Sequence, residues 1–142
     1  MDIVDRKTRS RMMSNIRAKD TRPEMIARRY FWGQGLRYRL HAKDLPGRPD
    51  IVFPRYRTVV EVRGCFWHGH HGCRYFQLPR TSRTFWRMKI FATAQRDRSN
   101  VRELRRLGWR VLVVWECQLR NGRPARLRTV TRKITAENRP PK

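Results

Sequence analysis

Asp50-Ile51-Val52-Phe53-Pro54-Arg55-Tyr56-Arg57-Thr58-Val59-Val60-Glu61-Val62 contains two short apolar runs, residues 51–53 and 58–62, on either side of a polar turn. Runs of this length, rich in β-branched residues and bounded by proline and polar residues, are typical of buried strands. The turn at residues 45–49 delivers Asp50 into the first run. The stretch therefore predicts two adjacent buried strands, around which the other elements can be placed.

Helical patterns lie on both sides of these strands. A capping box from Thr21 to Glu24, with proline in the first turn, begins a helix that Gly33 or Gly35 ends. Residues 84–107 are expected to form a long helix, 109–115 a strand and 124–137 a last basic helix. The long helix has an apolar stripe, which comprises Phe85, Met88, Phe91, Ala92, Val101, Leu104 and Leu107. This order predicts an α/β domain on a mixed sheet flanked by helices.

The chain of 142 residues is long enough for one domain with a real core. Residues 1–20 are polar and basic and are expected to form an N-terminal arm. Residues 21–137 then make a single domain, and residues 138–142 are expected to be a disordered tail. The sequence shows no long apolar stretch and no signal-peptide pattern, so we expect a cytoplasmic protein without membrane contact.

The charge of the chain is strongly one-sided. It has 35 Lys and Arg against 11 Asp and Glu, a formal net charge of +24. Self-repulsion of this size destabilises a compact domain unless a polyanion neutralises it. Because the basic residues are spread along the whole chain, nucleic acid is the favoured partner and a membrane surface the weaker one.

The cysteines indicate a metal site. Two of the three cysteines frame the segment Gly64-Cys65-Phe66-Trp67-His68-Gly69-His70-His71-Gly72-Cys73, and Cys117 follows the strand predicted at 109–115. An odd number of cysteines beside histidines favours metal ligation over disulfides. The three cysteines with either His70 or His71 would provide the tetrahedral ligand set of a structural Zn2+. Such a site leaves His68 free.

Acidic residues on the two predicted strands indicate a second kind of metal site. Asp50 begins one strand, and Glu61 lies near the end of the next. Two carboxylates on neighbouring strands suit a hard cation such as Mg2+. Arg63 points to the same face as Glu61 by the two-residue period of a strand, so it could meet a phosphate. Taken alone, these residues also fit ordinary turn and ion-pair roles.

Several segments together make a more specific pattern. They are Pro46-Gly47-Arg48-Pro49-Asp50, Gly64-Cys65-Phe66-Trp67-His68, Pro79 to Trp86, Arg96-Asp97-Arg98 and Leu107 to Cys117. In this order and at these separations, the chain resembles the very-short-patch-repair DNA mismatch endonucleases, the Vsr family, from about Arg6 to Cys117. The resemblance implies a restriction-endonuclease-like fold of the PD-(D/E)xK type. It also implies a monomeric enzyme that uses Mg2+ to nick one strand of duplex DNA beside the T of a T:G mismatch.

The resemblance also implies roles for single residues. Asp50 matches the metal-binding aspartate of the family, and Val62 matches the position whose backbone carbonyl serves the metal. His68 matches the general base, a role that suits an imidazole with a pKa near neutrality. Glu24 and Asp97 match acidic residues that support the active site from two helices. From the residues alone, non-catalytic roles also fit. His68 could be a zinc ligand or a capping side chain, and Glu24 and Asp97 could make surface ion pairs with nearby arginines.

Aromatic residues form another part of the resemblance. Phe66, Trp67 and Trp86 match side chains that enter the base stack beside the mismatch. A T:G wobble pair is weakly held, so inserting a side chain into the base stack costs less free energy there than at a matched pair. The basic residues of the first 20 positions resemble an arm that clamps the duplex.

The chain departs from the family at the metal sites. Val62 and Arg63 stand where some members have threonine and histidine, and we expect Arg63 to take over the electrostatic role of that histidine. Glu61 stands where the family is often apolar. With Asp50 and Arg63 it reproduces the general nuclease pattern of Asp followed by Glu-x-cation, so we include it among the Mg2+ ligands. The zinc loop is one residue longer than its shortest version, which favours His71 over His70 as the fourth ligand.

Two other functions compete with mismatch repair. One is a related nuclease of different specificity, linked to restriction or to a mobile element, which the altered Val62 and Arg63 positions keep open. The other is a zinc-stabilised DNA-binding module without activity, which the intact acidic residues and His68 disfavour. For the repair enzyme, the expected partners are double-stranded DNA with a T:G mismatch and mismatch-repair proteins, at the bacterial nucleoid.

Overall fold

The computed structural model describes residues 20–120, 122 and 124–136. Most of the predicted basic arm and the whole predicted tail, residues 138–142, lie outside this range. In the described part of the chain, a four-stranded mixed sheet has the order β1 (Arg39–Leu40), β2 (Ile51–Phe53), β3 (Thr58–Arg63) and β4 (Arg110–Trp115). The first three strands are antiparallel, and β4 runs parallel to β3. The α/β class and the two adjacent strands are thus confirmed.

Three helices and two short 3-10 helices, η1 (Pro54–Tyr56) and η2 (Glu116–Leu119), complete the described elements. The helices are α2 (Arg22–Gly33), α3 (Arg83–Arg106) and α4 (Ala125–Ala136). The start of α2 has the predicted cap, because the side chain of Thr21 accepts a hydrogen bond from the backbone N–H of Glu24 at 3.3 Å. Gly35, with φ +84°, follows the end of α2 in a conformation that favours glycine.

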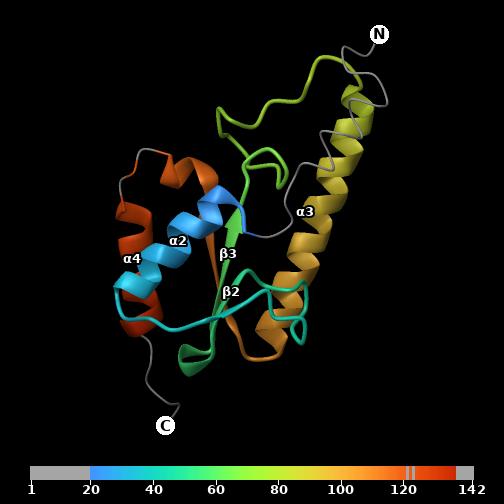
Figure 1. Cartoon of the computed structure of the whole chain (residues 1–142). Coiled ribbons are helices and arrows are strands. Elements are labelled where there is room, and N and C mark those ends of the chain that lie inside the picture. The colour runs from blue at the N-terminus through green and yellow to red at the C-terminus, as the bar shows by residue number, and fades with distance from the viewer. Residues whose placement is uncertain (1–19, 121, 123, 137–142) are drawn as a thin grey trace.

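The sheet lies between α2 and α4 on one face and α3 on the other (Figure 1), and an apolar cluster packs on each face. On one face, α2 and α4 pack their apolar side chains against Ile51, Phe53, Val60 and Val114. On the other face, α3 contributes Leu104 to a smaller cluster, which contains Val52, Val59 and Val111. Because side chains alternate along a strand, Glu61 and Arg63 follow Val59 on the α3 face. The polar end of β3 therefore opens into the space between the sheet and α3.

The apolar stripe predicted for the long helix is only partly buried. Leu104 is buried, but Met88 and Phe91 are 67% and 60% exposed. The N-terminal half of α3 extends past the ends of the strands, so the sheet does not cover it there (Figure 1). Trp86 and Ile90 are the buried residues of that half. No helix in the described ranges is long and apolar enough to cross a membrane.

Candidate active site

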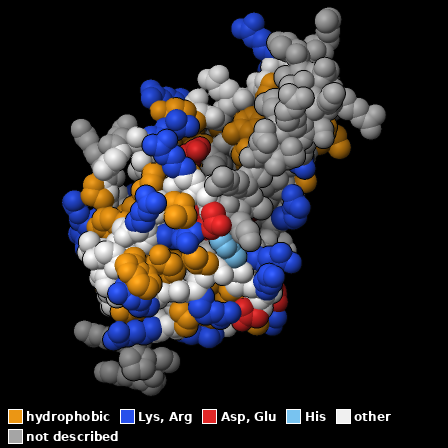
Figure 2. All heavy atoms as spheres, viewed as in Figure 1, with side chains coloured by type: hydrophobic (Ala, Val, Ile, Leu, Met, Phe, Trp, Pro, Cys, Tyr) orange, Lys and Arg blue, Asp and Glu red, His pale blue; other side chains and the backbone are white. Residues whose placement is uncertain are grey.

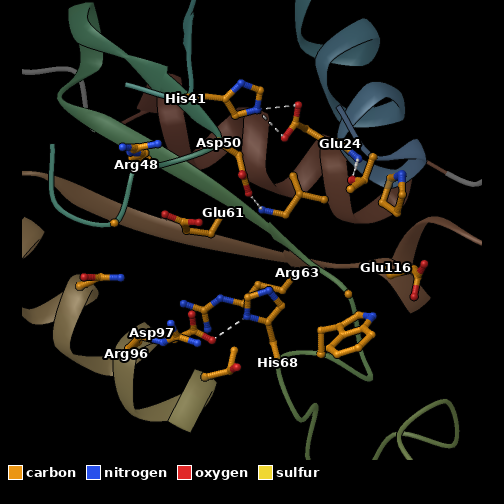
Figure 3. Close-up of a pocket in the computed structure, with 18 of the residues that line it drawn as sticks. Glu24, His41, Arg48, Asp50, Glu61, Arg63, His68, Arg96, Asp97 and Glu116 are labelled. Carbon is orange, nitrogen blue, oxygen red and sulfur yellow. Dashed lines mark hydrogen bonds and ion pairs between the residues drawn. The ribbon is translucent and has the colours of Figure 1, made fainter. Parts of the chain in front are cut away.

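A pocket lies between the polar end of the sheet, the start of α2 and the middle of α3 (Figure 3). Its lining includes all seven of the residues that the sequence predicted for catalysis and Mg2+ binding. These are Glu24, Asp50, Glu61, Val62, Arg63, His68 and Asp97. Residues up to 73 positions apart thus share one site.

Two carboxylates are crowded at the centre of the pocket. The Asp50 Oδ2 atom accepts a hydrogen bond from the backbone N–H of Val62 at 2.8 Å. Burial nevertheless raises the pKa of Asp50 to about 6, and the charge of Glu24 adds to this shift. Burial and the charge of Asp50 raise the pKa of Glu61 to about 8. Two desolvated acids that disfavour each other's charge fit a hard divalent cation, which would compensate both.

One side of this carboxylate pair faces an imidazole. The His68 Nδ1 atom lies 2.7 Å from the Asp97 Oδ2 atom, so a loop after β3 and the helix α3 together form a histidine–carboxylate pair. With Nδ1–H donating to Asp97, the other ring nitrogen of His68 has a lone pair that can accept a proton. In Figure 3, Asp50 and Glu61 lie between this pair and a second pair, which Glu24 of α2 forms with His41.

The second histidine–carboxylate pair was not found from the sequence. The Nε2 atom of His41 lies 2.9 Å and 3.1 Å from the two carboxylate oxygens of Glu24, which is 2% exposed. The backbone N–H of His41 also donates to the Asp50 carbonyl oxygen at 3.1 Å. His41 was the one histidine of four without a predicted role. Histidine is rare in this chain, and His41 lies only nine positions before Asp50. These two facts were the signal that could have identified it.

The three cysteines predicted as zinc ligands form a compact group with one of the two adjacent histidines. The ligand atoms of Cys65, His70, Cys73 and Cys117 all lie within 4.8 Å of one another. The His70 Nδ1 atom is 3.6 Å from the Cys117 Sγ atom. The three cysteines are free thiols. Three thiols and an imidazole in a closed tetrahedral group are the donor set that a structural Zn2+ favours.

His71, the histidine favoured from the sequence, is not in this group, and the structure places His70 there instead. The ring of His70 stacks on Trp115, with centroids 3.9 Å apart and planes 4° apart. Its backbone N–H donates to the Cys65 carbonyl oxygen at 2.9 Å, whereas His71 is exposed. Burial lowers the pKa of His70, which favours the neutral imidazole that a metal requires.

The three predicted wedge residues form one aromatic cluster. Ring centroids of Phe66 and Trp67 are 5.0 Å apart, and Trp86 lies 5.5 Å from Phe66 and 5.7 Å from Trp67. Phe66 and Trp67 are half-buried and line the pocket, whereas Trp86 is 8% exposed. In this conformation, Trp86 supports the two other rings from α3.

Basic side chains surround the site. Arg48, Arg63, Lys89 and Arg96 line the pocket, and Arg48 has a left-handed backbone with φ 48°. Figure 2 shows Lys and Arg side chains over much of the described surface of this face, with few acidic groups among them. A pocket with acidic ligands at its centre and cations around it suits a phosphodiester substrate.

Known proteins are similar in sequence to this chain over most of its length. The family described as DNA mismatch endonuclease Vsr matches residues 1–74. The type II nicking enzyme V.XorIIP of Xanthomonas oryzae pv. oryzae is 47% identical over 131 residues, 91% of this chain and 96% of that protein. The DNA mismatch endonuclease Vsr of Escherichia coli is 47% identical over 119 residues, 84% of this chain and 76% of that protein. The type II nicking enzyme V.NmeAIP of Neisseria meningitidis is 43% identical over 120 residues, 84% of this chain and 85% of that protein. The chain belongs to the Vsr family of DNA mismatch endonucleases, and it is an endonuclease that nicks DNA.

Proposed function

We propose that this enzyme recognises a T:G mismatch in duplex DNA and nicks one strand beside the mismatched T, using Mg2+, to begin very short patch repair. The observation that carries the proposal is the convergence of the His68–Asp97 pair and the Asp50–Glu61 carboxylates in one pocket lined also by Phe66. The fold is then of the restriction-endonuclease type with a structural Zn2+. We further propose that it acts as a monomer in the bacterial cytoplasm, at the nucleoid, beside mismatch-repair proteins.

The carboxylates would hold the catalytic cation. Asp50, Glu61 and the backbone carbonyl of Val62 are the proposed ligands of Mg2+. When bound, Mg2+ offsets the negative charge that develops on the phosphate. The hydrogen bond from the Val62 N–H fixes the Asp50 carboxylate, so this ligand is oriented before DNA arrives. His41 holds Glu24 at the edge of the same group.

The histidine pair would move the proton. A water oxygen bonds to phosphorus while the bond from phosphorus to the leaving sugar oxygen breaks. His68 accepts the proton of this water on its Nε2 atom, and Asp97 stabilises the imidazolium that results. Arg63, which lines the same pocket, neutralises charge on the phosphate.

The aromatic cluster would select the mismatch. Phe66 and Trp67 are placed to enter the base stack, with Trp86 behind them in the cluster. A wobble pair offers the smaller unstacking penalty, so selection follows from deformability of the DNA. The basic residues of the first 20 positions are proposed to clamp the duplex.

The test is strand-specific cleavage of two duplexes that differ only in one base pair. We expect a single nick beside T in the T:G duplex with Mg2+, and no cut in the matched duplex, when both strands are read at nucleotide resolution. Arg63, where some family members have histidine, favours a second candidate: a related nuclease with another specificity. Double-strand breaks at matched sites would establish that candidate instead.

Binding of Mg2+ to the free protein should depend on pH. The pKa of Asp50 is raised to about 6 and that of Glu61 to about 8, so at pH 6 Glu61 is protonated and Asp50 is partly protonated, and a cation must displace these protons. We expect Mg2+ affinity to rise by at least about tenfold between pH 6 and pH 8. Calorimetry in two buffers of different ionisation enthalpy measures the protons released. Equal affinity at both pH values would contradict the assignment, and Glu61→Gln should remove the part of the release near pH 8.

The two adjacent histidines give a direct test of the zinc site. His70→Ala removes one of four clustered ligands, so we expect Zn2+ affinity to fall by more than about a hundredfold. The melting temperature should fall with it, because binding of a structural metal stabilises the fold. His71→Ala is the matched control, since this exposed neighbour should leave both quantities unchanged. Metal content by mass spectrometry decides, and loss of Zn2+ in His71→Ala with retention in His70→Ala would reverse the assignment.

A further inference from the structure

A second groove lies beside the active site, between α3 and the sheet near β4. Three arginines of α3, Arg98, Arg102 and Arg105, line it together with Val101 and Val113. Arg63 and Asp97 complete the lining, and these two residues also line the catalytic pocket. The groove is therefore continuous with the place where the His68–Asp97 pair lies.

The three arginines form one stripe along the helix. Their spacing of four and three residues places them on the same face of α3. At 1.5 Å of rise per residue, the stripe is about 10 Å long. One strand of DNA has a phosphate for each 3.4 Å of helix axis, so the stripe spans about three nucleotide steps.

The charges of the stripe are not neutralised within the described protein. Within the described part of the chain, the guanidinium groups of Arg98, Arg102 and Arg105 make no hydrogen bond, ion pair or ring contact. The nearby acids have other partners, because Asp97 pairs with His68 and Glu103 pairs with Arg106. Like charges at this spacing destabilise a helix. An arrangement that is unfavourable in the free protein becomes favourable when a row of anions binds along it.

We propose that Arg98, Arg102 and Arg105 form a phosphate track that binds the backbone of the DNA to one side of the nick. This inference rests on the proposed function only in taking duplex DNA as the substrate. Guanidinium groups on successive turns contact phosphates without reading bases, so the track fixes the register of the duplex on the enzyme. None of the three arginines lies in the catalytic pocket, so they act on binding and not on the chemical step.

The test compares two triple variants that remove the same charge. Arg98→Gln/Arg102→Gln/Arg105→Gln empties the track, and Arg128→Gln/Arg132→Gln/Lys133→Gln is the control on α4, across the sheet from α3 (Figure 1). All six side chains are exposed, and glutamine is a good helix former, so both variants should fold. The dissociation constant of each protein for a T:G duplex is measured at several salt concentrations without Mg2+.

The track predicts a specific change in salt dependence. The slope of log affinity against log salt should fall by about 0.9 for each lost phosphate contact, thus by about 2 to 3 for the α3 variant. The α4 control should change the slope by less than about 1. Phosphate ethylation should interfere with wild-type binding at consecutive positions on one side of the nick, and the α3 variant should lose that interference. Equal slopes for the two variants, or interference that persists in the α3 variant, would overturn the proposal.

Nicking is measured in parallel so that the two proposals fail separately. At saturating DNA, the α3 variant should nick at a rate within about twofold of the wild type, because the removed groups contact no reacting atom. If the wild type binds with the expected slope but does not nick a T:G duplex, the proposed function fails and the track stands. If the wild type nicks and the slopes of the two variants agree, the track fails alone.

Discussion

Asp50→Ala should lower the rate of nicking by about a thousandfold or more while DNA binding is retained. The Asp50 carboxylate lies in the pocket and is fixed by a hydrogen bond of 2.8 Å from the backbone N–H of Val62. Loss of a cation that stabilises the transition state by several kcal/mol, about 4, corresponds to about three powers of ten in rate. Affinity for DNA should be unchanged or slightly higher, because a negative charge beside phosphate has been removed.

The measurement is a single-turnover rate on a T:G duplex with Mg2+, together with a dissociation constant without Mg2+. Asp44→Ala is the matched control, since Asp44 is an exposed aspartate whose ion pair is with Arg39. Asp50→Asn tests the same charge with the shape kept, and it should be as inactive as Asp50→Ala. Cleavage at near wild-type rate by either Asp50 variant would end the catalytic assignment.

His68→Gln has the second largest expected effect, a loss of about 10² to 10⁴ in nicking rate. The variant keeps a polar group but loses the base. Asp97→Asn should cost less, about 10- to 100-fold, because Asp97 acts by orienting the ring at 2.7 Å and stabilising its charged form. The double variant should be no slower than His68→Gln, since Asp97 acts through His68.

The same single-turnover assay checks this order of effects. His71→Gln is the control, because His71 is exposed and lies outside the pocket lining. Additive losses from His68→Gln and Asp97→Asn would show that the two residues act independently, against the pair described above.

Local sequence patterns were sufficient to predict the helices and strands that have a capping motif or an apolar run of their own. The box at Thr21 gave the start of α2, and the apolar runs gave β2, β3 and β4. The stripe predicted α3, but Met88 and Phe91 are exposed, because a sequence period shows which residues share a face but not where the neighbouring sheet ends.

The site was harder to predict where it depends on long-range packing. Strand alternation placed Glu61 and Arg63 on one face, and the resemblance added His68, Glu24 and Asp97. His41 was not predicted, because its role arises from contact with Glu24, 17 residues earlier. The His41 backbone itself has a left-handed φ of 46°. The choice of His70 over His71 depends on stacking against Trp115, a strand residue 45 positions later. No local spacing rule contains that contact.

The parallel pairing of β3 and β4 has a consequence for biosynthesis. Cys65 follows β3, Cys117 follows β4, and 52 residues separate them, with α3 between. A chain still on the ribosome, ended before Arg110, would lack both the last strand and the last thiol of the cluster. Parallel pairs with such separation form slowly, because a long loop must close first. If His68 is the general base, as proposed, unfinished copies of the enzyme would not cut DNA, since the loop that holds His68 becomes fixed only after Cys117 has been made.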